Sequence, residues 1–331
     1  MCYSVYGKTA IVTGAGSGIN FSFAALLFSK GCNVLIADLQ LRPEAEALVQ
    51  ASGCSRPPSP PASIASSASS SPAPSTFFPR MHFLKTDVTS WFDLSRMFSH
   101  AVSLFSTIDI VCPGAGIYEP PSSNFWFPPS LDQESPSCDD PLADHYKTLE
   151  VNVTHPIRVT QLAIGHFLKH GIKDGRVVLV SSQSGSGEVG ITTPLYYASK
   201  HAIHGFVKSM GRLEKEVGIK INAVAPGIVR TPLWLDAPEK LSTFSPSHDI
   251  WVTPESVAAA MFDLLTSPEH PGGTILEIGS ECRHVQPLND PGPQGAGFEL
   301  SNMQVATDGI FTRLRKGAYV HDMEFDAATM Q

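Results

Sequence analysis

Near the start of the chain, two apolar runs lie on either side of a glycine-rich turn and a third, longer apolar segment. The run Lys8–Thr13 predicts a short buried strand, and Asn33–Asp38 predicts a second one. Between them, three glycines lie within Gly14–Asn20, and Phe21–Lys30 predicts a helix. This order of strand, turn, helix and strand predicts a parallel βαβ unit.

The same unit has the features of a nucleotide site. A glycine-rich turn lets backbone N–H groups approach a diphosphate at the positive end of the following helix. The second strand ends on Asp38, 20 residues beyond Gly18. A carboxylate there accepts both hydroxyls of an adenosine ribose and repels a 2′-phosphate, which favours NAD over NADP.

Two stretches interrupt the pattern of strands and helices. Arg56–Thr76 is nearly all Ser, Pro and Ala, with Ile64 as its only bulky apolar residue. It cannot bury enough surface to offset the entropy of ordering, so we predict a disordered loop, residues 56–76. An insertion over residues 119–141 carries the aromatic residues Phe125, Trp126 and Phe127 among prolines. Such a cluster either covers the core or lines an apolar substrate pocket, and we favour the pocket.

Tyr196 and Lys200 are four residues apart in an expected helix, so the phenol and the ammonium can project into one site. A free phenol has a pKa of about 10 and is a poor base near neutrality. A nearby cation stabilises the phenolate, and lowering the pKa by about 2–3 units takes roughly 3–4 kcal/mol. We therefore predict that the pair works as a general acid and base.

Composition excludes several classes of protein. The 331 residues allow one large α/β domain or two smaller ones, and a hydrophobic content of 42% is enough for a sizeable core. A net charge of −8 argues against nucleic acid and anionic membranes as partners. No apolar stretch of 18 residues predicts a membrane span. Strand Lys8–Thr13 begins so early that we expect no signal peptide and a cytoplasmic protein.

The six cysteines contain no Cys-x-x-Cys pair, and two of them, Cys32 and Cys112, lie in expected core segments. This usage suits a reduced protein better than a disulfide scaffold. His201 and His204 lie three residues apart, but no third ligand is evident. We therefore expect no metal and interpret both as solvated or interface histidines.

Further segments with chemical character follow the glycine turn in a fixed order: Asp87-Val88, Pro113–Gly116, Asn152, Val177–Ser182 and Asn222–Gly227. Together with the turn and with Tyr196 and Lys200, they make the chain resemble the classical short-chain dehydrogenase/reductase family from about Lys8 to Gly279. The family motif Thr-Gly-x-x-x-Gly-x-Gly matches at Thr13, Gly14 and Gly18.

The chain departs from the family pattern at two positions. Asn20 replaces the last glycine of the first motif, and the family's Asn-Asn-Ala-Gly turn is here Pro113-Gly114-Ala115-Gly116. Asn tolerates positive φ better than other non-glycine residues, so the turn can survive. Pro113 removes a backbone donor and an amide that brace the fourth strand in relatives. We interpret both as local redesign with cofactor binding retained.

The resemblance implies a fold and a site. The fold is an α/β Rossmann-type doubly wound parallel sheet in a single domain, residues 1–279, with a C-terminal extension, residues 280–331. Helices are expected over about 144–170 and 195–217, packed side by side, and in relatives such helices form the interface of a homodimer or homotetramer. The implied cofactor site comprises Gly14, Ser17, Gly18, Ile19, Asp38, Asp87, Val88, Ala115, Gly116, Tyr196, Lys200, Pro226, Gly227, Ile228 and Thr231.

The implied catalytic residues are Asn152, Ser182, Tyr196 and Lys200. Ser182 would polarise the oxygen of a secondary alcohol, and Tyr196 would take its proton while hydride passes to NAD⁺. Lys200 would hold the phenolate and the nicotinamide ribose. Asn152 would order a water that passes the proton on towards solvent.

Two segments narrow the resemblance. Tyr197–Val207 followed by Asn222–Pro232 looks like the NAD-dependent hydroxyprostaglandin dehydrogenase branch, and Pro113–Pro121 with Asn124–Trp126 looks like fungal members of it that act in secondary metabolism. An apolar hydroxylated substrate, such as a terpenoid, meroterpenoid or polyketide alcohol, fits the aromatic insertion. Two alternatives stay open: an NADPH-dependent ketoreductase, and a cofactor-binding scaffold without redox chemistry, such as a cyclase, an isomerase or an interaction protein.

Overall fold

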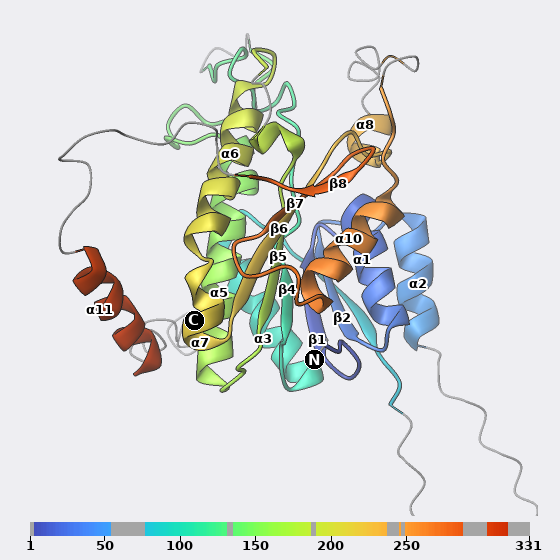
Figure 1. The fold of residues 1–331 in the computed structure, drawn as a ribbon. Helices are drawn as coiled ribbons and strands as arrows, with labels where there is room; N and C mark the ends of the chain where they lie inside the picture. The colour runs from blue at the N-terminus through green and yellow to red at the C-terminus, as the bar shows by residue number, and fades with distance from the viewer. Residues whose placement is uncertain are drawn as a thin grey trace, which may run out of the picture.

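The fold is built around a single eight-stranded sheet of order β3-β2-β1-β4-β5-β6-β7-β8 (Figure 1). The first seven strands are parallel, and β8 runs antiparallel to β7. The computed structural model describes residues 3–53, 77–130, 135–186, 190–236, 245, 249–286 and 303–316. The strands are β1 Thr9–Thr13, β2 Asn33–Asp38, β3 Met81–Lys85, β4 Ile110–Cys112, β5 Arg176–Val180, β6 Lys220–Pro226, β7 Ile275–Ile278 and β8 Cys282–His284.

Helices cover both faces of the sheet (Figure 1). One face packs on α3, α5 and α6 through the larger core cluster, and the other packs on α1, α2 and α10 through a second cluster. The helices of the two layers are α1 Gly18–Ser29, α2 Pro43–Gly53, α3 Trp91–Phe105, α5 His155–Lys169, α6 Pro194–Ser209 and α10 Pro254–Thr266. The shorter or peripheral ones are α4 Lys147–Leu149, α7 Arg212–Val217, α8 Pro232–Leu235 and α11 Met303–Arg315.

The apolar runs in the sequence form the strands because a parallel sheet is buried on both faces. Every residue of β1, β4 and β6 is buried, and β2 is buried up to its last residue. Cys32 and Cys112 are free and fully buried, as expected. The predicted Rossmann-type doubly wound sheet is confirmed.

The two long helices expected near the site are both interrupted. The first contains a π-helical segment, Glu150–Thr154, between α4 and α5. The second ends at Ser209 and resumes as α7 at Arg212. A side chain on Gly211 would place its Cβ 2.8 Å from the Gly272 carbonyl oxygen, so the chain turns where two backbones meet closely.

The C-terminal extension adds to the core at two places. Its first residues form β8, which extends the sheet beyond β7. Helix α11 packs beside α7, where Phe311 and Leu314 are buried. The predicted disordered loop, residues 56–76, lies outside the described residues. Within them, no helix is long and apolar enough to cross a membrane.

Candidate active site

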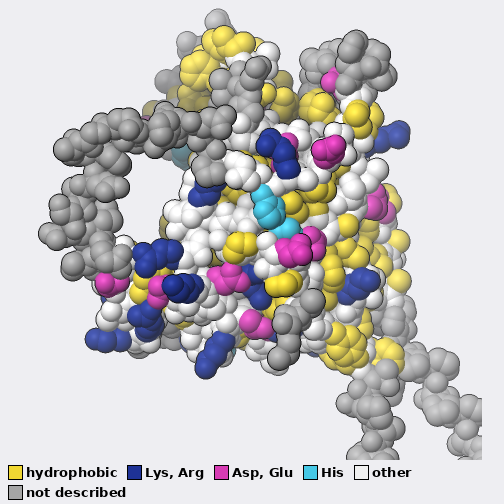
Figure 2. All heavy atoms as spheres, in the orientation of Figure 1, with side chains coloured by type: hydrophobic (Ala, Val, Ile, Leu, Met, Phe, Trp, Pro, Cys, Tyr) yellow, Lys and Arg dark blue, Asp and Glu magenta, His cyan; other side chains and the backbone are white. Residues whose placement is uncertain are grey.

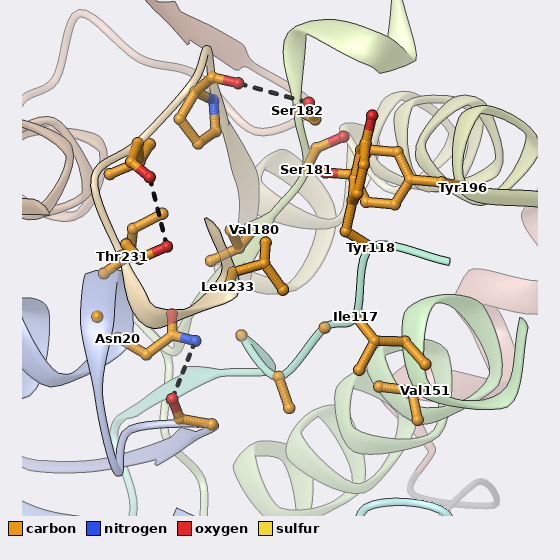
Figure 3. A pocket seen from close by; sticks show the side chains of 18 of the residues that line it. Asn20, Ile117, Tyr118, Val151, Val180, Ser181, Ser182, Tyr196, Thr231 and Leu233 are labelled. Carbon is orange, nitrogen blue, oxygen red and sulfur yellow. Dashed lines mark hydrogen bonds between the residues drawn. The ribbon is translucent and has the colours of Figure 1, made fainter. Parts of the chain in front are cut away.

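A cavity of about 550 Å³ lies where the carboxyl ends of the parallel strands meet (Figure 3). The strand order reverses between β1 and β4, and a doubly wound sheet binds its ligands at such a switch point. All the residues predicted to bind the cofactor line this cavity. Of the four predicted catalytic residues, Ser182, Tyr196 and Lys200 line it, and Asn152 lies behind Gly116.

The glycine turn brings the backbone to one wall of the cavity. Gly14 has φ 68°, and a Cβ there would lie 2.6 Å from the Cα of Ala115. Gly18 has φ 60° and begins α1, whose first turn carries no acidic side chain. Ser17 makes no capping hydrogen bond to the helix. The free N–H groups and the positive end of α1 therefore face the cavity, as an anion site requires.

Asp38 lies at the end of β2 beside the glycine turn. Its Oδ2 accepts a hydrogen bond from the Gly16 N–H at 2.8 Å, and its Oδ1 accepts one from the Leu39 N–H at 2.7 Å. A side chain on Gly16 would collide with this carboxylate and with the Gln40 carbonyl oxygen. The aspartate thus fixes the glycine turn and lines the cavity.

Asp87 follows β3 and lines the same end of the cavity. Its Oδ1 accepts hydrogen bonds from the N–H and the hydroxyl of Thr89. Burial acts to raise the pKa of Asp87, but these bonds and Lys147 outweigh it, and the pKa is lowered. The Asp87 carboxylate is therefore charged, and its hydrogen bonds to Thr89 hold the turn that leads into α3.

The two departures from the family pattern fit one another. Asn20 is buried in α1, and a Cβ on Gly114 would lie 2.3 Å from its Oδ1. The Asn20 amide also donates to the Gly14 carbonyl oxygen at 3.4 Å (Figure 3). The family has glycine in the first position and asparagine in the second. Here the amide enters from the helix into the space that the glycine leaves free.

A buried hydrogen-bonded pair, Thr13 and His155, holds the turn after Pro113, where the backbone donor and the amide of relatives are missing. The Thr13 hydroxyl oxygen accepts the N–H groups of Gly114 at 3.0 Å and Ala115 at 3.3 Å. Thr13 in turn lies 3.0 Å from Nε2 of His155, whose Nδ1 lies 3.0 Å from the Val151 carbonyl oxygen. Because that carbonyl only accepts, Nδ1 carries the proton and Nε2 accepts from Thr13.

Burial lowers the pKa of His155 to about 4, so this arrangement holds with a neutral ring near neutrality. Sequence reasoning missed His155. The only signal was a histidine in an apolar helix, which by itself does not identify a partner on β1.

Ser182 and Tyr196 meet on the opposite wall (Figure 3). The Ser182 hydroxyl donates to the Pro226 carbonyl oxygen at 3.5 Å. It also lies close enough to the Tyr196 phenol to act against the rise of that group's pKa. Tyr118 packs edge-on against the Tyr196 ring with centroids 4.6 Å apart. Tyr118 also lies against Trp234, with centroids 5.3 Å apart. An alcohol oxygen placed between the serine and the tyrosine would therefore have aromatic side chains around it.

Lys200 lies one helical turn beyond Tyr196, but it does not depress the phenol pKa as expected. Its Nζ donates to the Val180 carbonyl oxygen at 3.1 Å and lies 5.4 Å from the centroid of the phenol ring. Burial raises the pKa of Tyr196 to about 12 and lowers that of Lys200 to about 8. Desolvation outweighs the attraction between the groups, because it disfavours the charged form of each.

Asn152 lies at the centre of the π-helical segment. Its Oδ1 accepts the Ile117 N–H at 2.9 Å, and its Nδ2 donates to the Ile117 carbonyl oxygen at 2.8 Å and to Ser199 Oγ at 3.2 Å. These hydrogen bonds of Asn152 thus connect the segment that follows β4 to α6. Single π turns occur often at functional sites, where they redirect a side chain.

Thr231 and α8 cover the cavity from the side of β6. The Thr231 side chain lies against Gly18, and its hydroxyl faces the Val229 carbonyl oxygen at 3.4 Å (Figure 3). Trp234 on α8 lines the cavity. The expectation for Phe125 and Trp126 was wrong, since neither lines it, and they are 49% and 51% exposed.

Apolar side chains gather outside the cavity at the end of the molecule that carries α8 (Figure 2). They come from the insertion, from the segment before α6 and from α8: Phe125, Trp126, Phe127, Ile191 and Leu235. The Trp126 indole donates to the Ile191 carbonyl oxygen at 2.7 Å. This hydrogen bond joins the insertion to the segment that precedes α6.

The two histidines on α6, His201 and His204, differ in their burial. His201 is exposed, with Nδ1 2.9 Å from the Tyr197 carbonyl oxygen. His204 is not solvated, because it is buried against Gly185. Among the described residues, no three His, Cys, Asp or Glu side chains form a group that could hold a metal ion.

Known proteins resemble the chain in sequence and in fold. The family model of the short chain dehydrogenases matches residues 61–241. The short-chain dehydrogenase/reductase prx6 of Penicillium rubens is 28% identical over 215 residues, which cover 64% of this chain and 69% of that protein.

Two solved structures share the fold. A short chain dehydrogenase from Burkholderia cenocepacia in complex with NADP has a TM-score of 0.59 and 24% identity, over 84% of this chain and 98% of that one. A 3-ketoacyl-(acyl-carrier-protein) reductase from Brucella melitensis complexed with NADH has a TM-score of 0.60 and 23% identity, over 83% and 98%. By its sequence and by its fold, the chain belongs to the short chain dehydrogenase family.

Proposed function

We propose that the protein is an NAD-dependent dehydrogenase that oxidises a secondary alcohol of an apolar substrate to a ketone. The observation that carries the proposal is the cavity itself, which brings Ser182, Tyr196 and Lys200 together beside a glycine turn and Asp38. The cavity thus combines a dinucleotide wall with a general acid and base.

NAD rather than NADP is supported by Asp38. Its carboxylate already accepts two backbone N–H groups and lines the cavity where the adenosine ribose would lie. A 2′-phosphate there would meet this negative charge. The cation nearest along the chain, Arg42, is paired with Asp236 on the far side of the cavity mouth.

In the proposed mechanism, Ser182 holds the substrate oxygen. Tyr196 would take the proton of that oxygen as a phenolate, the form that Lys200 and the positive charge of bound NAD⁺ would stabilise. Bound NAD⁺ supplies the hydride acceptor and a positive charge beside the phenol. Lys200, whose pKa burial lowers to about 8, can exchange its proton near neutrality and so return the phenol to its starting state. Asn152 holds the segment around Ile117 against α6. One lone pair of its Oδ1 is left to bind the water of the proton relay.

An apolar substrate is supported by Tyr118 and Trp234 inside the cavity and by the apolar side chains around it. A short polar alcohol would leave these surfaces in contact with water. A bulky hydroxylated lipid, terpenoid or polyketide would cover them. We include in the proposal that the protein is a homodimer or homotetramer, as its family members typically are.

The proposal is tested by incubating the purified protein with NAD⁺ or NADP⁺ and a panel of secondary alcohols, from short polar ones to sterols and terpenoid alcohols. NADH formation with bulky apolar alcohols is expected. Faster turnover with NADP⁺ would contradict the cofactor assignment.

The variant Asp38→Asn sharpens the cofactor test, since it keeps an acceptor for one N–H group but removes the charge. We expect NADPH affinity to rise and NADH affinity to fall in fluorescence titrations, with their ratio changing by about 10-fold, which corresponds to about 1.4 kcal/mol. An unchanged ratio would show that Asp38 does not select the cofactor.

A further inference from the structure

Glu119 is a buried carboxylate that the mechanism above does not use. Its side chain is 3% exposed, and it follows Tyr118 in the segment after the Gly114–Gly116 turn. Its backbone has φ 35°, a conformation that L side chains seldom adopt. No ion pair among the described residues involves it. Its charge must therefore be stabilised by hydrogen bonds.

Those hydrogen bonds come from the first turn of α6 and from the aromatic insertion. Glu119 Oε2 accepts the N–H of Tyr196 at 2.9 Å, and Oε1 accepts the N–H of Phe125 at 3.0 Å. The helix lacks a cap of its own, because Thr193 makes no side-chain capping bond and Pro194 has no N–H. A carboxylate at this end also complements the positive end of the helix.

The same residue holds the aromatic insertion. Asn124 donates to the Glu119 carbonyl oxygen at 3.1 Å, while the carboxylate holds the next residue, Phe125. Glu119 therefore bonds the insertion with one oxygen and the helix that carries Tyr196 with the other.

We propose that Glu119 is the positioning residue of the proton acceptor: its carboxylate caps α6 and fixes Tyr196 relative to Ser182. The inference rests on the proposed function of Tyr196. A Gln at this position has nearly the same volume, but its NH₂ would face an N–H donor in place of an acceptor. The helix start would lose its cap, and the phenol would shift from the serine. Misplacement of a reacting group by about 1 Å can cost about 10²-fold in rate.

The experiment compares Glu119→Gln and Glu119→Asp with the wild-type chain. Asp keeps the charge on a shorter side chain and serves if Gln does not fold. Asn124→Ala is the matched control, since it frees the insertion but leaves the carboxylate on α6. Three quantities are measured: amide hydrogen exchange at Leu195 and Tyr196, the Kd for NADH, and kcat and KM for the best alcohol of the panel.

We expect faster exchange at Leu195 and Tyr196 in Glu119→Gln, and kcat lower by about 10- to 10²-fold. Glu119→Asp should fall between this variant and wild type. The Kd for NADH should be unchanged in both, and Asn124→Ala should keep wild-type exchange and kcat.

Wild-type exchange in both Glu119 variants would overturn the inference, and so would faster exchange with a wild-type kcat, which would leave Glu119 a purely structural cap. If no alcohol in the panel reacts, the proposed function fails, and the exchange at Tyr196 still decides whether Glu119 caps the helix.

Discussion

At the scale of single residues, the two departures from the family pattern compensate for each other: an amide is gained at Asn20 and lost at Gly114. We call this pair of changes the exchange. The Asn20 amide fills the space beside Gly114, and neither position can be understood without the other. The sequence shows both residues, but positions 20 and 114 are far apart in the chain. Only the packing of α1 on the turn after β4 shows that they meet.

This exchange predicts strong coupling between the two positions. Gly114→Asn alone should lower the melting temperature and the affinity for NADH, because its side chain collides with Asn20. Adding Asn20→Gly should recover both, with a coupling energy of about 2 kcal/mol in a double-mutant cycle. Gly309→Asn on α11 is the control, since a side chain there meets open space. Additive effects of the two substitutions would contradict the exchange.

At the same scale, the neutral ring of His155 makes stability depend on pH. The ordinary pKa of 6.5 is lowered by burial to about 4 in the folded protein. Between these values the unfolded chain binds a proton that the folded chain does not, so the free energy of unfolding falls as the pH drops from about 6.5 to about 4. The loss due to this group reaches about 2 kcal/mol near pH 5.

Urea unfolding at about pH 7 and about pH 5 measures this term. The wild-type chain should lose about 2 kcal/mol more than His155→Gln over that interval. The exposed His201→Gln is the control and should lose as much as wild type. Equal losses in all three chains would show that His155 is not neutral in the fold.

At the scale of elements, the sequence predicts the sheet better than the segments around the site. Strands β1, β2, β5 and β6 follow from apolar runs, because burial on both faces of a parallel sheet requires such runs. The π turn at Asn152 depends on paired hydrogen bonds with Ile117, 35 residues away. The cap of α6 depends on Glu119, 77 residues away. Local patterns carry no signal for either contact.

The aromatic residues show the same limit. The sequence favoured Phe125, Trp126 and Phe127 as pocket residues, but the aromatic residues that line the cavity include Trp234 and Tyr118 and none of these three. Phe125 and Trp126 are about half exposed outside the cavity. The aromatic residues of its wall come from α8 and from the segment after β4.

Kinetics with a bulky apolar alcohol distinguish the two tryptophans. Trp234→Ala should raise KM by about 10-fold or more, since burying a large apolar side chain contributes about 1.5–3 kcal/mol. Trp126→Ala, the same change outside the cavity, should have a much smaller effect. Affinity for NADH should stay constant in both. A larger effect at Trp126 would place the substrate on the outer apolar surface instead.

At the scale of the whole molecule, two halves of the chain meet at one edge of the sheet. The glycine turn, Asp38 and the turn after β4 line one side of the cavity, and β5, α6 and α8 line the other. In the proposed function, the first side binds the dinucleotide and the second binds the substrate. Apolar side chains also lie on the outer surface at this end (Figure 2).

The central claim is that Tyr196 takes the proton of the alcohol, and the variants Tyr196→Phe and Tyr197→Phe test it most directly. Both keep the aromatic ring and remove one hydroxyl, and both residues line the cavity. Turnover with NAD⁺ and the best alcohol of the panel should fall by roughly 10²–10⁴-fold in Tyr196→Phe, with NADH affinity nearly unchanged. Tyr197→Phe should keep a rate close to wild type. Wild-type turnover in Tyr196→Phe, or the large loss in Tyr197→Phe instead, would contradict the account.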